Sequence, residues 1–251
     1  MNGGLQILRS GGVVAVLTAL VWATVPARPA WAATTGSGQA RTETRAVSDF
    51  DGIALAGSID LVVRQSGREA VEVRADDNLL PLIETVVESG GAGRTLHVRI
   101  KRGESVRTKT PIVVTVDLVR LTRLASAGSG DVRIENLKSP KLKVSLSGSS
   151  DAKLQQLAID ELTLSVAGSG SVSAAGTAGQ AKASIAGSGN LELKTLVADD
   201  VSISIAGSGD AKVTANKALR VSIAGSGDVE YSGDATEVKS SVAGSGRVTR
   251  R

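Results

Sequence analysis

The chain has 251 residues, of which 41% are hydrophobic but only 2% aromatic, and its formal net charge is +4. It has no cysteine, which excludes disulfides, thiolate nucleophiles and cysteine metal sites, and its one histidine excludes a multi-histidine metal site. Because wide layered cores are usually filled by aromatic residues, their scarcity favours a narrow fold filled by Val, Ile, Leu and Ala.

Residues 1–32 have the features of a cleavable secretory signal. Arg9 precedes the apolar run 13–22, and residues 30–32 read Ala-Trp-Ala, an A-x-A cleavage site. The run is too short to span a bilayer and no later stretch is apolar enough, so we expect no membrane span in the mature chain. We predict an exported protein, periplasmic or extracellular, with or without attachment to the cell surface. The remaining 219 residues have an excess of only two basic residues, which makes nucleic acid a poor partner.

Residues 33–46 are predicted to be a flexible linker, and residues 47–120 an irregular N-terminal part of the same repeat fold that follows. Alternation of apolar and polar residues at 71–73 and 96–100, and less regularly at 112–116, predicts strands. Residues 53–61 are a degenerate copy of the later repeat and predict one additional rung. Residues 78–83, Asn-Leu-Leu-Pro-Leu-Ile, break the alternation and predict a short helical turn or cap.

Residues 121–251 contain a repeat of regular length. The first glycine of Ala-Gly-Ser-Gly, or of a close variant, recurs in steps of 18 to 20 residues. Its seven positions are Gly128, Gly148, Gly168, Gly187, Gly207, Gly225 and Gly244. This period is typical of a solenoid, whereas the blades of a propeller need about 40 residues each.

Each repeat alternates apolar and small residues before its glycine, as in residues 164–167, Leu-Ser-Val-Ala. A period of two predicts a strand with one buried face, and glycine at the corner reaches backbone angles that other residues avoid. The positions predicted to face inward are Val144, Leu164, Ile203, Val221, Leu146, Val166, Ile185, Ile205, Ile223 and Val242. With a third apolar cluster later in each repeat, we predict three short strands and three corners per repeat. The fold class is therefore all-β, a right-handed parallel β-helix (β-solenoid) of about 19–20 residues per rung.

Two motifs accompany the repeats: residues 50–53, Phe-Asp-Gly-Ile, and a segment from Asp77 to Glu84 that begins Asp-Asn-Leu-Leu. In these motifs and in its run of Gly-Ser-Gly-Asp copies, the chain resembles the head-GIN-domain family. These are bacterial exported proteins of unknown function that are also labelled auto-transporter adhesins. The resemblance covers nearly the whole chain after residue 32. It implies a right-handed β-helix and supplies no catalytic residues.

A column of mostly acidic or amide residues follows the second glycine of the repeats. Its aspartates are Asp131, Asp151, Asp210 and Asp228. Stacked carboxylates repel unless water or a cation screens them, and Ca²⁺ prefers several oxygen ligands, so these four are candidate calcium ligands. The interpretation that we favour is that Asp and Asn lie at turns because their side chains bond the nearby backbone. We therefore assign no metal and no cofactor.

Serine forms two further columns. One lies at the corner, from Ser129 to Ser245, and the other on the adjoining strand, from Ser145 to Ser241. A flat face of Ser, Ala and Gly lets another surface approach closely, which suggests a docking face for a polymer or a partner. The alternative is that small residues are simply what a tight corner tolerates.

The only histidine, His97, is expected to face outward from an alternating strand. A basic cluster lies beside it around an expected turn, and is either a contact for anionic lipid or polysaccharide or a solvated loop. Its members are Arg99, Lys101, Arg102, Arg107 and Lys109.

These observations leave two classes of function. The first, which we favour, is a non-catalytic extracytoplasmic module that binds polysaccharide, an envelope component or another protein, in adhesion or in envelope structure. The second is a polysaccharide lyase or hydrolase, because parallel β-helices often carry such enzymes with paired carboxylates. Short corners and scarce aromatic residues weigh against it, so we predict no enzyme and no catalytic residue.

Overall fold

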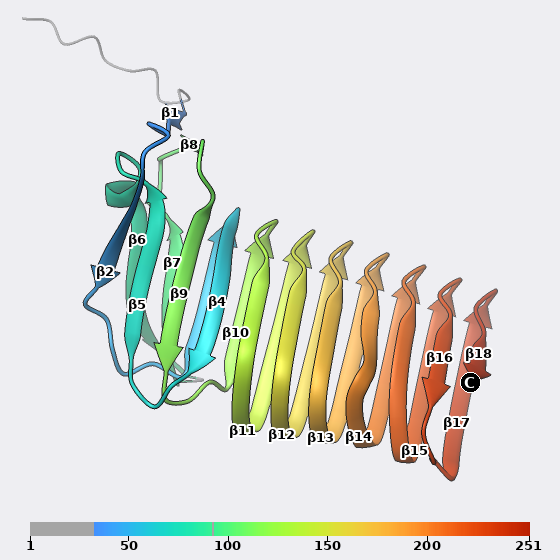
Figure 1. Cartoon of the computed structure of the whole chain (residues 1–251). Helices are drawn as coiled ribbons and strands as arrows, with labels where there is room; N and C mark the ends of the chain where they lie inside the picture. The colour runs from blue at the N-terminus through green and yellow to red at the C-terminus, as the bar shows by residue number, and fades with distance from the viewer. Residues whose placement is uncertain (1–32, 92) are drawn as a thin grey trace, which may run out of the picture. The chain divides into compact units, whose positions relative to one another are not determined.

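Strands make up almost all of the regular structure, which a computed structural model describes for residues 33–91 and 93–251 (Figure 1). The predicted secretory signal at residues 1–32 lies outside the described residues. Residues 33–251 form one compact unit. No helix in the described part of the chain combines the length and the hydropathy that crossing a membrane requires.

Coils of parallel strands stack one on the next through the C-terminal part of this unit (Figure 1). Their strands are β10 (Arg123–Gly128), β11 (Val132–Gly148), β12 (Ala152–Gly168), β13 (Val172–Gly187), β14 (Leu191–Gly207), β15 (Ala211–Gly225), β16 (Val229–Ser232), β17 (Glu237–Gly244) and β18 (Val248–Arg250). Neighbouring coils pair at a register of one repeat, so that Gly168 is level with Gly148 and Gly187. The predicted β-solenoid is confirmed.

Each full repeat is one long strand that bends twice, where the sequence predicted three short strands. In β12 two consecutive residues, Gln155 and Gln156, are not buried, and the same is true of Asp160 and Glu161. Each break in the alternation marks a corner, and Gln156 takes a positive φ of 48° at the first one. The Gly-Ser-Gly turn is the third corner. Two walls of the stack flank this turn. The serine wall is the segment just before each Gly-Ser-Gly turn, residues 162–167 in β12 and their partners in other coils. The front wall is the segment just after each such turn, residues 152–154 in β12 and their partners.

Aliphatic side chains from every coil fill one continuous core between the walls. Residues predicted to face inward, such as Val166, Ile185 and Ile205, are buried there. Val242 is the exception, because 41% of its surface is exposed. It belongs to β17, and among the described residues no further coil covers that side of β17, so its inward position stays open to solvent.

The Gly-Ser-Gly corner requires glycine for two reasons that Gly207 illustrates. Its φ is +136°, and a Cβ placed on it would lie 2.2 Å from the carbonyl oxygen of Gly187 in the preceding coil. The backbone N–H of Ser208 donates to that same carbonyl oxygen at 2.9 Å. The corners of successive coils therefore touch through their backbones, which leaves no room for a side chain at the first glycine.

The stack continues into the N-terminal part out of sequence order. β3 (Gly52–Gly57) pairs with β10, and β4 (Ile59–Gln65) pairs with the first part of β11, so that Gly57 is level with Gly128. Residues 53–61 are thus the additional rung that the sequence predicted. On their other side, β7 (Gly93–Ile100) and β9 (Ile112–Leu118) pair in parallel with β3 and β4.

Antiparallel strands complete the N-terminal part. β5 (Ala70–Asp76) pairs with β9, and β6 (Ile83–Gly90) pairs with β7. The 3₁₀-helix η1 (Leu80–Leu82) precedes β6, where the sequence predicted a helical turn. The N-terminal part is therefore a mixed sheet built on two coil-like layers.

Residues 33–46, predicted to be a flexible linker, instead contain two strands. β1 (Thr34–Thr35) pairs with β8 (Val106–Arg107), and β2 (Ala40–Arg45) pairs antiparallel with β5. All six residues of β2 are exposed or half-buried, as they would be in a linker. Their backbone nevertheless pairs with β5 along the whole strand.

Candidate binding face

The aspartate column, which lies between the Gly-Ser-Gly corner and the front wall, connects the coils through hydrogen bonds. Oδ1 of Asp210 accepts the backbone N–H of Asp228 at 2.8 Å, and Oδ1 of Asp228 accepts that of Arg247 at 2.9 Å. Asp151 accepts the N–H of Ser171 in the same way, and Asp60 that of Asp131. The residue bonded belongs to the next coil of the stack, not to the local turn that the sequence suggested.

The four candidate calcium ligands therefore lie in one column, as expected. Of these four, Asp151, Asp210 and Asp228 each give one oxygen to a backbone N–H. Across residues 33–91 and 93–251, no group of three or more His, Cys, Asp or Glu side chains is arranged to hold a metal ion.

Serines of the two predicted columns lie where the sequence placed them. At the corner, the hydroxyls of Ser58 and Ser129 are 2.9 Å apart. On the serine wall, Ser184 donates to the hydroxyl of Ser165 at 3.3 Å and contacts the carbonyl oxygen of Leu164 at 3.5 Å.

A groove of about 510 Å³ follows the serine wall from β12 to β17. Its sides are two columns of outward residues, and the strand backbone between them is its floor. The first column has the members Thr163, Lys182, Ser202, Arg220 and Lys239. The second has the members Ser184, Ser204, Ser222 and Ser241. The lining has three basic residues and no acidic one.

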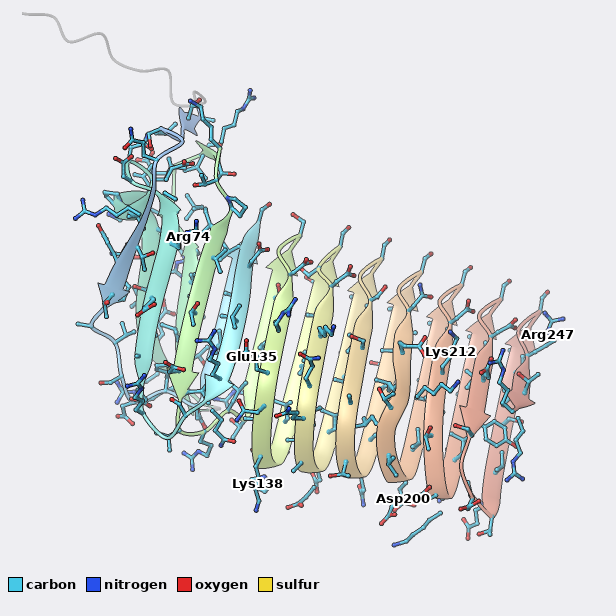
Figure 2. All side chains as sticks on the ribbon, viewed as in Figure 1. Arg74, Glu135, Lys138, Asp200, Lys212 and Arg247 are labelled. Atoms are coloured by element: carbon cyan, nitrogen blue, oxygen red, sulfur yellow. The ribbon has the colours of Figure 1, made fainter. Side chains whose placement is uncertain are left out.

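Two of these cations make no ion pair or hydrogen bond within the part of the chain that the structure describes. They are Lys182 and Lys239, both exposed. Arg220 has one distant partner, Glu237, at 3.9 Å. On the front wall, Lys212 pairs with Glu192 at 3.0 Å (Figure 2), whereas Arg133 and Lys153 of the same column have no partner among the described residues.

Sequence reasoning missed this basic column, although the signal is present. Each member stands two residues before an outward serine, as in Lys182-Ala-Ser184 and Arg220-Val-Ser222. Aligning the repeats on that serine brings the basic residues together. The predicted basic cluster near His97 is different, because its Arg99 pairs with two carboxylates.

Within that predicted cluster, Arg99 donates to Glu84 at 2.7 Å and to Glu88 at 3.1 Å. The hydrogen bond to Glu84 raises the pKa of Arg99. The backbone of Lys109 donates to Asp76 at 2.9 Å. His97 is partly exposed, with Nε2 3.7 Å from a carboxylate oxygen of Glu88. These groups hold the N-terminal sheet together.

A second hollow, a cleft of about 730 Å³, lies at the end of the N-terminal sheet where the motif 50–53 is found. Asp51 is central to the wall of this cleft. Its carboxylate accepts Arg123 at 2.8 Å and the Thr122 hydroxyl at 3.2 Å, and its carbonyl accepts the backbone N–H of Thr122. The motif thus fastens β3 to β10 across 71 residues of sequence.

The Asp-Asn motif at residues 77–78 has a similar structural role together with the buried Asp76. Asp77 accepts the hydroxyl of Ser37 at 2.5 Å, and Oδ1 of Asn78 accepts the backbone N–H of Ser37 at 2.8 Å. Asp76 accepts backbone N–H groups from Gly38 and Lys109 at 2.9 Å each. Residues 36–39 are thereby held against the β8–β9 connection.

The fold and its walls define a β-solenoid scaffold of the kind that presents a long repeated face. Residues 49–235 match the family model described as "Putative auto-transporter adhesin, head GIN domain". The chain belongs to this family, as the motifs at residues 50–53 and 77–84 indicated.

Solved structures share the fold. A putative adhesin from Bacteroides fragilis has a TM-score of 0.81 at 27% identity, over 86% of this chain and 99% of that one. A putative adhesin from Parabacteroides merdae has a TM-score of 0.71 at 25% identity, over 87% and 98%. A putative lipid binding protein from Parabacteroides distasonis has a TM-score of 0.73 at 27% identity, over 88% and 100%. No curated protein matches this chain.

Proposed function

We propose that the protein is an exported, non-catalytic binding module. It binds an extracytoplasmic ligand on the serine wall of its coils. The observation that carries the proposal is the groove, which extends over several coils and combines hydroxyl and cationic side chains without a carboxylate. A binding role also agrees with the adhesin names of two similar structures.

The enzyme alternative has less support. Glycoside hydrolysis usually takes two carboxylates that flank the scissile bond, one of them able to protonate the leaving oxygen. The groove lining offers none, and Asp151, Asp210 and Asp228 of the aspartate column each accept a backbone N–H group. We infer that the aspartate column serves the backbone and not a cation.

Export is the first part of the proposal to test. The full chain is expressed in a bacterium with a secretory pathway, and the protein recovered outside the cytoplasm is sequenced from its N-terminus. The sequence is expected to begin just after Ala32, at the predicted cleavage site. Retention of the intact chain in the cytoplasm would contradict export.

Binding without turnover is the second part. The purified protein is mixed with whole bacterial cells and with isolated envelope polysaccharide. Co-sedimentation of the protein and the formation of new reducing or unsaturated ends of the polysaccharide are measured on the same samples. We expect saturable co-sedimentation and no increase in reducing or unsaturated ends. An increase of either kind of end would favour the enzyme, and a failure to co-sediment would contradict the binding module.

A further inference from the structure

We propose that the ligand of the groove is an anionic polysaccharide, lying along the stacking axis with its acidic groups on Lys182, Arg220 and Lys239. This inference rests on the proposed function and names the class of ligand for the same site. It is carried by the spacing of the three cations, by their lack of strong partners, and by the hydroxyl column beside them.

The three cations belong to one column along the stack. Lys182 is level with Ser202, which is level with Arg220, which is level with Lys239. Because neighbouring parallel strands are about 4.8 Å apart, the backbone positions of the first two cations are roughly 10 Å apart and those of the last two roughly 5 Å apart. A linear polymer with regularly spaced acidic groups can contact all three at once, which a single small anion cannot.

The charges of the groove are complementary to such a polymer. Lys182 and Lys239 have no partner among the described residues, and the Glu237 carboxylate is 3.9 Å from Arg220. With no acidic residue in the lining, nothing inside the groove repels a bound carboxylate or sulfate. The cations remain hydrated and exposed, so each contact is weak and the affinity must come from several contacts together.

The second column supplies hydrogen-bonding groups suited to sugars. Ser204, Ser222 and Ser241 are exposed and make no hydrogen bond to another described residue through their hydroxyls. A hydroxyl both donates and accepts, so it can pair with either role of a sugar hydroxyl. A serine at every coil offers one such group about every 4.8 Å along the polymer.

An anionic membrane fits the same surface less well. Beside the cations, at the lower bend of the coils, lie Asp200 (Figure 2) and Glu237. A flat bilayer would meet these carboxylates, whereas a narrow chain inside the groove would not. The lining also has no aromatic or large exposed aliphatic side chain to enter the lipid.

The test compares two triple variants of the full chain. The groove variant is Lys182→Ser, Arg220→Ser, Lys239→Ser, which installs the residue that already occupies this column at Ser202. The control variant is Arg133→Ser, Lys153→Ser, Lys212→Ser, in one column of the front wall. Both lose three positive charges from exposed positions, so net charge alone cannot separate them.

Binding is measured by calorimetry at low salt with polygalacturonate, with neutral dextran, with galacturonate monomer, and with phosphatidylglycerol vesicles. We expect wild type and control variant to bind polygalacturonate and the groove variant to bind at least about tenfold more weakly, because three exposed ion pairs each contribute little. Affinity is expected to increase with oligomer length, with negligible monomer binding, and to decrease as salt is added.

Several results would overturn the inference. Equal losses in both variants would assign the effect to net charge, and stronger binding of vesicles than of polymer would assign the face to lipid. If no polymer binds but cells still co-sediment with the protein, the polysaccharide inference fails while the proposed function stands. If co-sedimentation is absent as well, both fail.

Discussion

The N-terminal part, residues 33–118, and the coils, residues 123–251, solve the same problem of stacking strands by different means. The coils repeat one set of backbone contacts, from the glycine corner to the aspartate column. The N-terminal part is fastened by individual polar side chains such as Asp51 and Asp76, which bond segments far apart in sequence. Repetition leaves the outward positions of the coils free to vary, and this is where the groove lies.

The largest effect is expected in the core of the coils. Ile205 is almost fully buried between neighbouring coils, so Ile205→Asp buries a charge without a partner and should destabilise the protein by more than about 4 kcal/mol. The exposed neighbour Ser204 is the control, and Ser204→Asp should stay within about 1 kcal/mol. Urea denaturation measures both; similar losses would mean that the inward and outward faces are wrongly assigned.

The next effect distinguishes a glycine at a corner that contacts the preceding coil from a glycine at a turn with open space around it. Gly207→Ala introduces a Cβ 2.2 Å from a backbone oxygen at a positive φ, and should cost more than about 3 kcal/mol. Gly67 in the N-terminal part also has a positive φ, +77°, but a Cβ there meets nothing within 4 Å. Gly67→Ala should therefore cost only the backbone strain, about 1–2 kcal/mol. Equal costs in thermal unfolding would refute the contact between corners.

Substitution of Asp76 tests how much its hydrogen bonds stabilise the N-terminal part. Burial alone would raise the pKa of Asp76, but hydrogen bonds from Lys109, Thr110 and Gly38 hold it below its ordinary value of 3.8. The carboxylate thus stabilises the fold at pH above 3.8, and this contribution is lost as pH decreases through the lower pKa of the folded state.

We therefore expect Asp76→Asn to lower the Tm at neutral pH, because its amide nitrogen cannot accept the N–H groups that the lost oxygen bonded. The difference from wild type should narrow as pH decreases below about 4. A difference that is constant between pH 7 and pH 3 would show that the charge of Asp76 is not what fastens this region.

The smallest effect concerns a matched exchange inside the coils. Ser126 occupies an inward position that is aliphatic in other coils, and Ser150 replaces the second glycine of its corner; their hydroxyls are 3.2 Å apart. At the equivalent place two coils on, a Cβ on Gly189 would lie 2.8 Å from Cγ1 of Val166.

Ser126→Val alone should therefore cost about 1–3 kcal/mol through overpacking against Ser150. Ser126→Val with Ser150→Gly should recover most of that loss, with a coupling of about 1 kcal/mol or more in a double-mutant cycle. Strictly additive effects would show that the two serines do not share one packing site.

The coils could be predicted from the sequence because their information is local. The alternation around Leu164 and the glycine at Gly168 set the strand, its buried face and its corner within one repeat. The N-terminal pairings depend on contacts between residues far apart in sequence, such as Asp51 and Thr122. No short sequence pattern shows that these two residues form a hydrogen bond. Val242 takes the inward register that alternation predicts but is exposed, because burial depends on the neighbouring coil as well as on alternation.

The candidate site was predicted only in part. The serine column was recognised. The basic column beside it does not repeat strictly, because Thr163 and Ser202 occupy the positions on either side of Lys182. Their common face becomes clear only when the coils are stacked. The aspartate column was recognised as turn chemistry, but its bond to the next coil depends on the stacking register.

Lysine labelling shows whether an anionic polymer lies on the serine wall. The full chain is acetylated briefly with and without polygalacturonate, and each lysine is quantified by mass spectrometry. We predict that labelling of Lys182 and Lys239 decreases severalfold with polymer while labelling of Lys153 on the front wall and Lys101 in the N-terminal part stays unchanged. Equal protection of all four lysines, or protection of Lys101 alone, would contradict the account.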